Sequence, residues 1–125
     1  MIQTLSLVAL GGAIGAALRY LANVSALRLL GPGFPYATLL VNVAGSFLIG
    51  LLFVMLMDKG GGRLGPFVLT GILGGFTTFS AFSLDTLVLV EKGQGAMAAV
   101  YVAASVGLSL TAIVAGLALG RGIWA

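Results

Sequence analysis

The amino-acid sequence predicts an all-α membrane protein of four transmembrane helices, the third of them broken. Of its 125 residues, 60% are hydrophobic and only 7% are charged, and the mean hydropathy is +1.20. Soluble domains carry about 25% charged residues, which argues against a soluble fold. Loops rich in glycine, proline and charge leave four apolar segments, at about 4–30, 36–57, 64–90 and 96–119. Each is long enough to cross the hydrocarbon core, and together they form one domain over residues 1–125.

Charged and reactive side chains are scarce, which excludes several classes of function. Six basic and three acidic residues give a net charge of +3, too small and too scattered for a nucleic-acid-binding face. The absence of cysteine and histidine excludes thiol chemistry, disulfides and Cys/His zinc sites. No serine has a histidine to activate it, and the acids Asp58, Asp85 and Glu91 form no acid–base pair on one helix face. We therefore do not expect an enzyme.

The first segment is expected to be a true span rather than a cleaved leader, because Met1–Thr4 lacks the basic region of a signal peptide. It carries small residues four positions apart, a spacing that lets helices approach closely. These residues are Gly11, Gly12, Gly15 and Ala16. Arg19 follows Gly15 by four residues on the same helix face. An arginine in a span either snorkels to the interface or faces a cavity, where it would attract anions.

The second segment has one strongly polar residue, Asn42, with Gly45 and Ser46 on the same helix face. A buried amide needs hydrogen-bonding partners. Because it offers two N–H donors and one acceptor, Asn42 can hold a neighbouring helix or contact an anion, and the sequence leaves both roles open.

The third segment contains Gly74–Ser80, which combines two adjacent glycines with three hydroxyl side chains in an apolar run. We expect the glycine pair to break the helix. The bilayer core has no water for freed backbone groups, so such a break is tolerated only where protein or a water-filled path surrounds it. Transport proteins bind ions and substrates at broken helices, so the break predicts movement of something small across the membrane. Its exposed carbonyl oxygens would suit a cation, and two copies on a two-fold axis would form a cage of them.

Phe79 and Phe82 follow the glycine pair and are three residues apart, on one helix face. The edge of an aromatic ring carries partial positive charge, so these edges could contact an anion without a strong hydrogen bond. The alternative is plain packing against lipid or protein.

The fourth segment carries Tyr101, Ser105 and Ser109 at intervals of four residues, which form one polar stripe. This stripe is either a contact between helices or a wall of hydroxyls along a path, and the sequence favours neither.

Basic residues are nearly balanced between the two ends of the spans. Lys59, Arg63 and Arg121 belong to the end that carries both termini, whereas Arg28 and Lys92 belong to the other, together with Arg19 if it snorkels that way. The positive-inside rule therefore assigns no clear orientation. We expect dual topology, in which copies insert both ways and pair antiparallel; the alternative is a small bias that sets one orientation. Four short helices enclose little interior, so a homodimer is the simplest closed assembly.

Three motifs stand out: residues 11–20 (GGAIGAALRY), residues 41–47 (VNVAGSF) and residues 74–83 (GGFTTFSAFS). Together they resemble the Fluc (CrcB) fluoride channels of microbial membranes. The resemblance covers essentially the whole chain, including the number of spans and the positions of the loops, and the third motif is long and specific.

This resemblance implies a passive, fluoride-selective channel that exports fluoride from the cytoplasm across the cell (inner) membrane. It implies an antiparallel, dual-topology homodimer with two pores in the lipid bilayer. Asn42 would line each pore with the ring edges of Phe79 and Phe82. The remaining residues implied near the pore are Ser83, Tyr101, Ser105 and Ser109.

The resemblance also implies a cation site and a vestibule. A structural sodium ion would lie at the dimer centre, held by the backbone oxygens of Gly74 and Thr77 from both subunits. Arg19 would lie at the pore vestibule. Two positions depart from the family's usual pattern: Ala81 lacks a hydroxyl that the family often has, and Asp85 is shorter than the usual glutamate, which puts an ion-handling role there in question.

The alternative function is a small four-span multidrug exporter coupled to protons, which shares the size and the near-balanced charge. Such exporters need a carboxylate within the membrane, and Asp85 is the only candidate, close to a span end. A third alternative, a subunit that assembles without transporting, leaves the glycine pair and Asn42 without a purpose.

Overall fold

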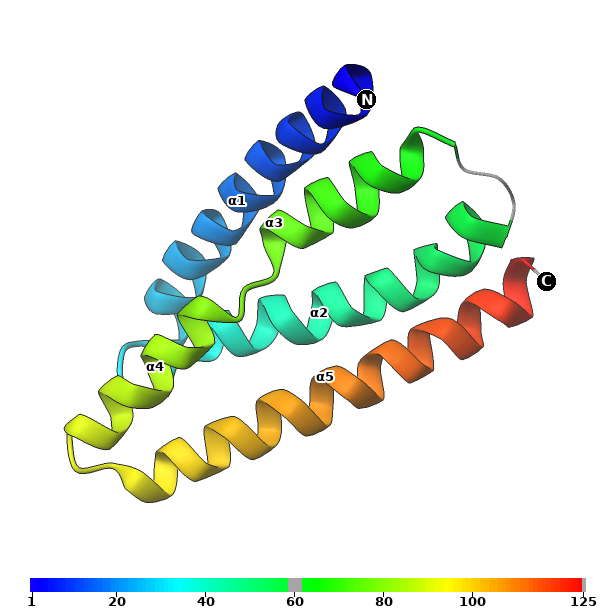
Figure 1. Ribbon diagram of the computed structural model, residues 1–125. Helices are drawn as coiled ribbons and strands as arrows, with labels where there is room; N and C mark the ends of the chain where they lie inside the picture. Colours follow the sequence, from blue (N-terminus) through cyan, green and yellow to red (C-terminus); the bar gives the residue numbers. More distant parts are fainter. Residues whose placement is uncertain (59–61, 125) are drawn as a thin grey trace.

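The computed structural model describes residues 1–58 and 62–124, and this part of the chain is helical apart from short connections (Figure 1). Four helices in it are long and apolar enough to cross a membrane: Ile2–Leu30, Tyr36–Leu56, Pro66–Glu91 and Gly95–Ile123. The predicted all-α class and the four spans are confirmed. Both termini lie at one end of the bundle, and the turns at 31–35 and 92–94 lie at the other. Lys59, one of the basic residues weighed for orientation, lies outside the described residues.

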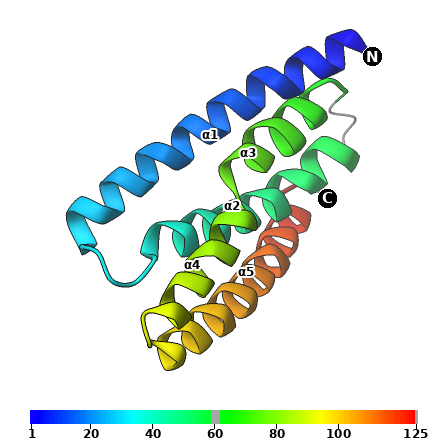
Figure 2. The same ribbon diagram turned by 60° about the vertical axis from the view of Figure 1, so that its left-hand side comes forward.

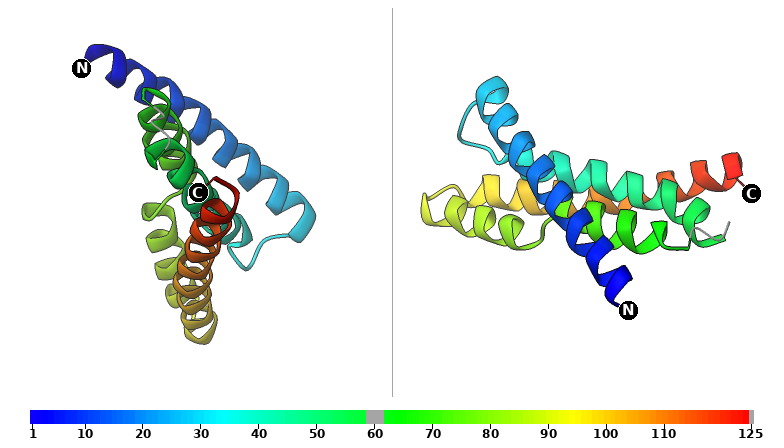
Figure 3. Two further views of the ribbon diagram at one scale, coloured as in Figure 1. Left: turned by 90° about the vertical axis from the view of Figure 1, so that its right-hand side faces the viewer. Right: turned by 90° about the horizontal axis from the view of Figure 1, so that it is seen from above.

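The helices follow one another along the chain as α1 (Ile2–Leu30), α2 (Tyr36–Phe53), η1 (Val54–Asp58), η2 (Pro66–Leu73), α3 (Gly74–Phe76), α4 (Ser80–Glu91) and α5 (Gly95–Trp124), where η marks a π-helical stretch. Figure 2 shows α1 and α5 on opposite sides, with α2 and the third span between them. Seen from above, α1 crosses the other helices obliquely (Figure 3). The third span is thus built from η2, α3 and α4, and its two halves are held by different neighbours: η2 and α3 pack on α1, and α4 packs on α5.

Close backbone contacts join the helices wherever glycines face a neighbour. A Cβ added at Gly11 would lie 2.5 Å from the carbonyl oxygen of Phe67 in η2, and one at Gly15 would overlap the carbonyl oxygen of Ile72. The small residues of the first span therefore serve packing of α1 on the third span, as their spacing predicts. A second pair four residues apart, Gly116 and Gly120 of α5, makes the same kind of contact with α2 and was not singled out from the sequence.

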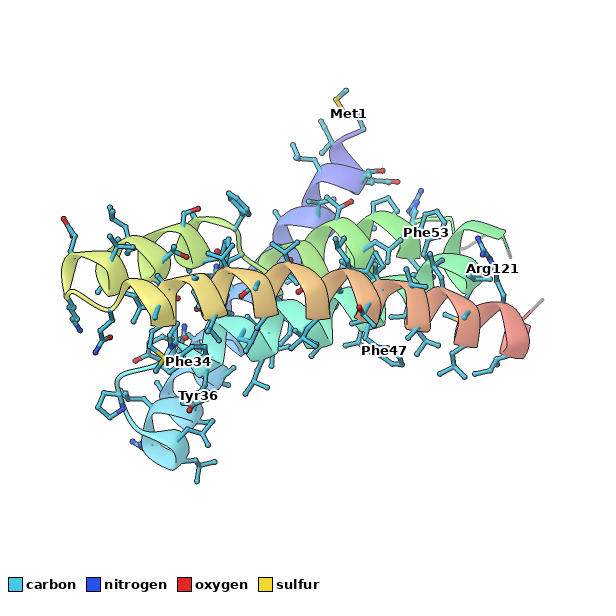
Figure 4. All side chains as sticks on the ribbon, turned by 90° about the horizontal axis from the view of Figure 1, so that it is seen from below. Met1, Phe34, Tyr36, Phe47, Phe53 and Arg121 are labelled. Carbon is cyan, nitrogen blue, oxygen red and sulfur yellow. The ribbon has the colours of Figure 1, made fainter. Side chains whose placement is uncertain are left out.

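The single chain buries few large side chains. One cluster, formed by Leu89, Ala98 and Tyr101, is packed by the half-buried Phe34, Leu39 and Phe82. Elsewhere apolar side chains project outward along the whole bundle, as Met1 and Phe53 do in Figure 4. An apolar exterior over this length is the surface that a bilayer or a second membrane subunit covers.

The third span leaves the helical conformation after α3, not at the glycine pair. Gly74 and Gly75 are both helical, α3 ends at Phe76, and Thr77 is extended, with φ −84° and ψ 160°. Helix resumes at Ser80. The expectation that the glycines themselves break the helix is therefore corrected. Gly75 serves close packing instead, because a Cβ there would lie 2.7 Å from the carbonyl oxygen of Gly12 on α1.

Candidate functional site

A groove of about 460 Å³ lies beside the non-helical residues 77–79, between α2, α4 and α5. Its polar lining comprises Asn42, Ser46, Thr77, Thr78, Ser105 and Ser109. Phe79, Phe82 and Gly74 also border it. The structure thus brings into one groove residues that the sequence places in three separate spans. Two of the predicted pore residues, Ser83 and Tyr101, do not border it.

Asn42 is paired with the backbone of the interrupted segment. Its Oδ1 accepts a hydrogen bond of 2.8 Å from the Thr78 N–H, and its Nδ2 donates one of 2.9 Å to the Thr78 carbonyl. In a continuous α-helix, the same N–H would bond to the carbonyl of Gly74 and the same carbonyl would accept from Phe82. The half-buried amide therefore satisfies backbone groups that the interruption frees, as buried polar groups require.

Thr78 also caps the helix that follows. Its Oγ1 accepts a hydrogen bond of 3.1 Å from the backbone N–H of Ala81 and lies 3.3 Å from the hydroxyl of Ser80. A threonine hydroxyl bound three residues ahead is the usual way to satisfy a free N–H at a helix start. Thr78 therefore satisfies one free N–H in the first turn of α4, and the positive end of the α4 dipole lies at the groove that Thr78 lines.

Two serine hydroxyls of the groove have no partner. Ser105 is buried, with 6% of its surface exposed, and neither its Oγ nor that of Ser109 makes a hydrogen bond within the described chain. A buried hydroxyl without a partner is unfavourable, so such groups in a native structure call for a ligand or water. This observation favours the hydroxyl-wall interpretation of the stripe for Ser105 and Ser109.

The aromatic side chains at the groove differ in exposure. Phe79 is 78% exposed, whereas Phe82 is half-buried, and their ring centroids are 5.5 Å apart. Phe82 in turn packs on the fully buried ring of Tyr101, with centroids 5.2 Å apart. Phe82 thus forms the inner wall of the groove, and Phe79 presents its ring beyond the single chain.

Tyr101 and Asp85 belong to a second polar cluster, next to the groove. The Asp85 carboxylate accepts hydrogen bonds of 2.7 Å from Thr38 Oγ1 and 3.1 Å from the Tyr101 hydroxyl. These bonds tie α4 to α2 and α5. Thr38 is buried and escaped the sequence analysis, although its position four residues before Asn42 on α2 was a usable signal.

Asp85 and Thr38 border another cavity, of about 370 Å³, at the loop end of the bundle together with Asn23 and Lys92. Ser83 is exposed, and its hydroxyl bonds back to the Phe79 carbonyl at 3.0 Å. Its place is on the outside of α4, so the structure does not bring it to the other predicted pore residues.

Arg19 reaches the same interruption from the opposite side. Its Nε donates a hydrogen bond of 3.1 Å to the carbonyl oxygen of Gly75, and the side chain is half-buried. The last carbonyls of a helix lack helical partners and carry partial negative charge, so a cation at the end of α3 is favourable. This contact joins Arg19 to the third span, and the two roles considered for it, snorkelling to the interface and attracting anions, stay predictions.

The backbone around Gly74 and Thr77 fits a cation. The Thr77 N–H and hydroxyl both bond to the carbonyl of Leu73, at 3.0 and 2.9 Å, while Thr78 gives its N–H to Asn42. The Gly74 carbonyl thereby loses its α-helical donor, and Gly74 is exposed. Within the described chain, no group of three or more acidic side chains gathers to hold a metal. Backbone and hydroxyl oxygens are therefore the donor set on offer, and they suit a hard monovalent or divalent cation.

Comparisons with known proteins agree over nearly the whole chain. The profile of the family described as CrcB-like protein, Camphor Resistance (CrcB), matches residues 6–117. A protein of Cereibacter sphaeroides (strain ATCC 17029 / ATH 2.4.9) is 60% identical over 122 residues, covering 98% of both chains. One of Paracoccus denitrificans is 57% identical over 125 residues, covering 100% of both, and one of Rhizobium etli (CFN 42) is 53% identical over 125 residues, covering 98% of this chain and 99% of its own. Each of the three is named fluoride-specific ion channel FluC, and nothing in these comparisons supports the multidrug-exporter alternative.

Proposed function

This chain belongs to the CrcB-like family, and we propose that it is a fluoride-selective ion channel, not an enzyme, through which fluoride leaves the cytoplasm passively. The single observation that supports this most is the groove beside Thr78, where the buried hydroxyls of Ser105 and Ser109 have no hydrogen-bond partner among the described residues. A small anion that sheds water needs donors at successive points, and these hydroxyls are free to supply them.

Selectivity follows from the kind of donor in the groove. Fluoride holds its water tightly, so the path must replace that water with several short contacts, none strong enough to trap the ion. Hydroxyl groups of Ser105 and Ser109, an N–H of Asn42 and the ring edges of Phe79 and Phe82 meet this requirement together. No charged side chain of the described residues borders the groove, so its contacts with an anion come from neutral groups.

We propose that the working unit is an antiparallel homodimer of dual topology in the cell (inner) membrane. Phe79 is 78% exposed in the single chain, and a second copy would cover it and complete the aromatic wall. The described basic residues at the two ends, Arg63 and Arg121 against Arg28 and Lys92, are balanced enough to let copies insert both ways.

A structural sodium ion would be held where the two interruptions meet, by the backbone oxygens of Gly74 and Thr77 from each copy. When bound, the ion supplies positive charge that compensates carbonyl dipoles left without N–H donors. Arg19 donates a hydrogen bond to the Gly75 carbonyl, so this helix end is also stabilised from the side of α1. Positive charge around the interruption also attracts anions to the vestibule.

Fluoride efflux from vesicles tests the proposal. Purified protein in liposomes loaded with potassium fluoride is expected to release fluoride when valinomycin lets potassium follow, and to release at least tenfold less chloride from matched vesicles. Protein-free vesicles are the control. Equal release of both halides, or release no faster than in protein-free vesicles, would refute a fluoride-selective channel.

A further inference from the structure

The pairing of Asn42 with Thr78 has an unusual property: both ends of one side-chain amide bond to the two polar groups of one backbone residue. The distances are 2.8 Å from Thr78 N to Oδ1 and 2.9 Å from Nδ2 to Thr78 O. Exchanging the amide oxygen and nitrogen would set two donors against each other and two acceptors against each other. The pairing therefore fixes which end of the amide is the donor, a choice that is otherwise free for asparagine.

We propose that Asn42 is a positioning residue for the interruption: one side-chain amide replaces the two helical hydrogen bonds that Thr78 gives up. This replacement has two consequences. The Thr78 N–H no longer bonds to the Gly74 carbonyl, so that oxygen lacks its helical donor. The Thr78 hydroxyl is placed to accept a hydrogen bond from the Ala81 N–H in the first turn of α4. The geometry of both halves of the third span thus depends on a side chain from α2.

The same pairing decides what Asn42 offers to an ion in the groove. With Oδ1 accepting from Thr78 and one Nδ2 hydrogen given to its carbonyl, the hydrogen that remains unengaged is the second one on Nδ2. Asn42 borders the groove, so it presents a spare donor there with the amide orientation already set. This last step rests on the proposed function, whereas the pairing with Thr78 does not.

Hydrogen–deuterium exchange separates these claims from a general structural role. Asn42→Leu removes both bonds and Asn42→Asp keeps an acceptor for the Thr78 N–H but has no N–H. Asn23→Leu makes the same change on α1, away from the groove. In lipid nanodiscs, peptides covering residues 77–82 are expected to exchange about tenfold faster in Asn42→Leu, the effect of losing a buried hydrogen bond. Peptides from α5 should stay within about twofold of wild type, since a general loss of stability would raise exchange everywhere.

Asn42→Asp is the second variant, and it tests the pairing if Asn42→Leu does not assemble. It keeps an acceptor for the Thr78 N–H but sets a carboxylate oxygen against the Thr78 carbonyl, so exchange over residues 77–82 should rise less than in Asn42→Leu, while fluoride efflux falls at least tenfold. Asn23→Leu should match wild type in both measurements. Wild-type exchange over residues 77–82 in Asn42→Leu, or in Asn42→Asp where Asn42→Leu does not assemble, would overturn the positioning role. Absent efflux in the wild type refutes the channel proposal instead, and the exchange data still decide the pairing.

Discussion

Replacing Gly75 by alanine tests whether α1 and the third span are held by direct backbone contact. A Cβ at this position would lie 2.7 Å from the Gly12 carbonyl oxygen, 3.1 Å from the Gly12 Cα and 3.3 Å from the Ala16 nitrogen, whereas ordinary contacts begin at 3.4 Å. All three atoms belong to the α1 backbone, so no side-chain rotation relieves the overlap. The helix must move by about half an ångström or more, which also strains the Arg19 bond to the Gly75 carbonyl.

Overpacking of this kind costs about 1–3 kcal/mol, offset by up to about 1 kcal/mol because alanine favours a helix more than glycine. With the full offset, we expect Gly75→Ala to lower the free energy of unfolding by about 0–2 kcal/mol, and to be about 1–3 kcal/mol less stable than an alanine variant that gains the same offset without the overlap, measured by SDS titration in mixed micelles with tryptophan fluorescence or circular dichroism. Gly107→Ala is the matched control. Gly107 lies two residues from both Ser105 and Ser109, on the opposite face of α5, and a Cβ there meets no atom of another helix within 4 Å in the described part of the chain. Gly107→Ala should be neutral or slightly stabilising. A Gly75→Ala protein as stable as the Gly107→Ala protein would refute the contact argument.

Three further outcomes are expected. Ser105→Ala removes a buried hydroxyl that has no partner, so stability should hold or rise by up to about 1 kcal/mol while fluoride efflux falls; a loss of stability with unchanged efflux would contradict a role in the ion path. Thr38→Val leaves the Asp85 carboxylate with one hydrogen bond fewer, so the free energy of unfolding should drop by about 1–3 kcal/mol. A double-mutant cycle with Tyr101→Phe should show that the two losses are not additive, because both side chains donate to Asp85. Additive losses would argue against a shared network. Replacing sodium by N-methylglucamine should weaken the dimer, measured by subunit exchange between labelled copies, and an exchange rate indifferent to the cation would count against the carbonyl cage.

The polar clusters show where sequence reasoning stopped. Asn42 was recognised as a residue with two open roles, but the partner that satisfies it, the backbone of Thr78, is 36 residues away and is visible only in the folded chain. Thr38 was missed although it lies four residues before Asn42 on the same helix face, because this spacing does not reveal its partner. Its importance comes from Asp85, which is on a different helix.

The glycine pair illustrates a different limit. Two adjacent glycines are a good signal of irregular backbone, and the interruption does follow within a few residues. Yet glycine is also the residue that lets two helices touch, and this is the use the fold makes of Gly75. Sequence alone does not distinguish these two uses, because both depend on the missing Cβ.

The number and helical nature of the spans were determined by the sequence itself. A bilayer forces an apolar segment of this length to satisfy its backbone internally, so hydropathy and loop signals suffice to find each helix. Which helices touch, where the third span leaves its helix, and which buried hydroxyls remain without partners were decided by the tertiary structure. These features depend on hydrogen bonds and contacts between residues far apart in the chain, and the periodicity of a single segment carries no information about its neighbours.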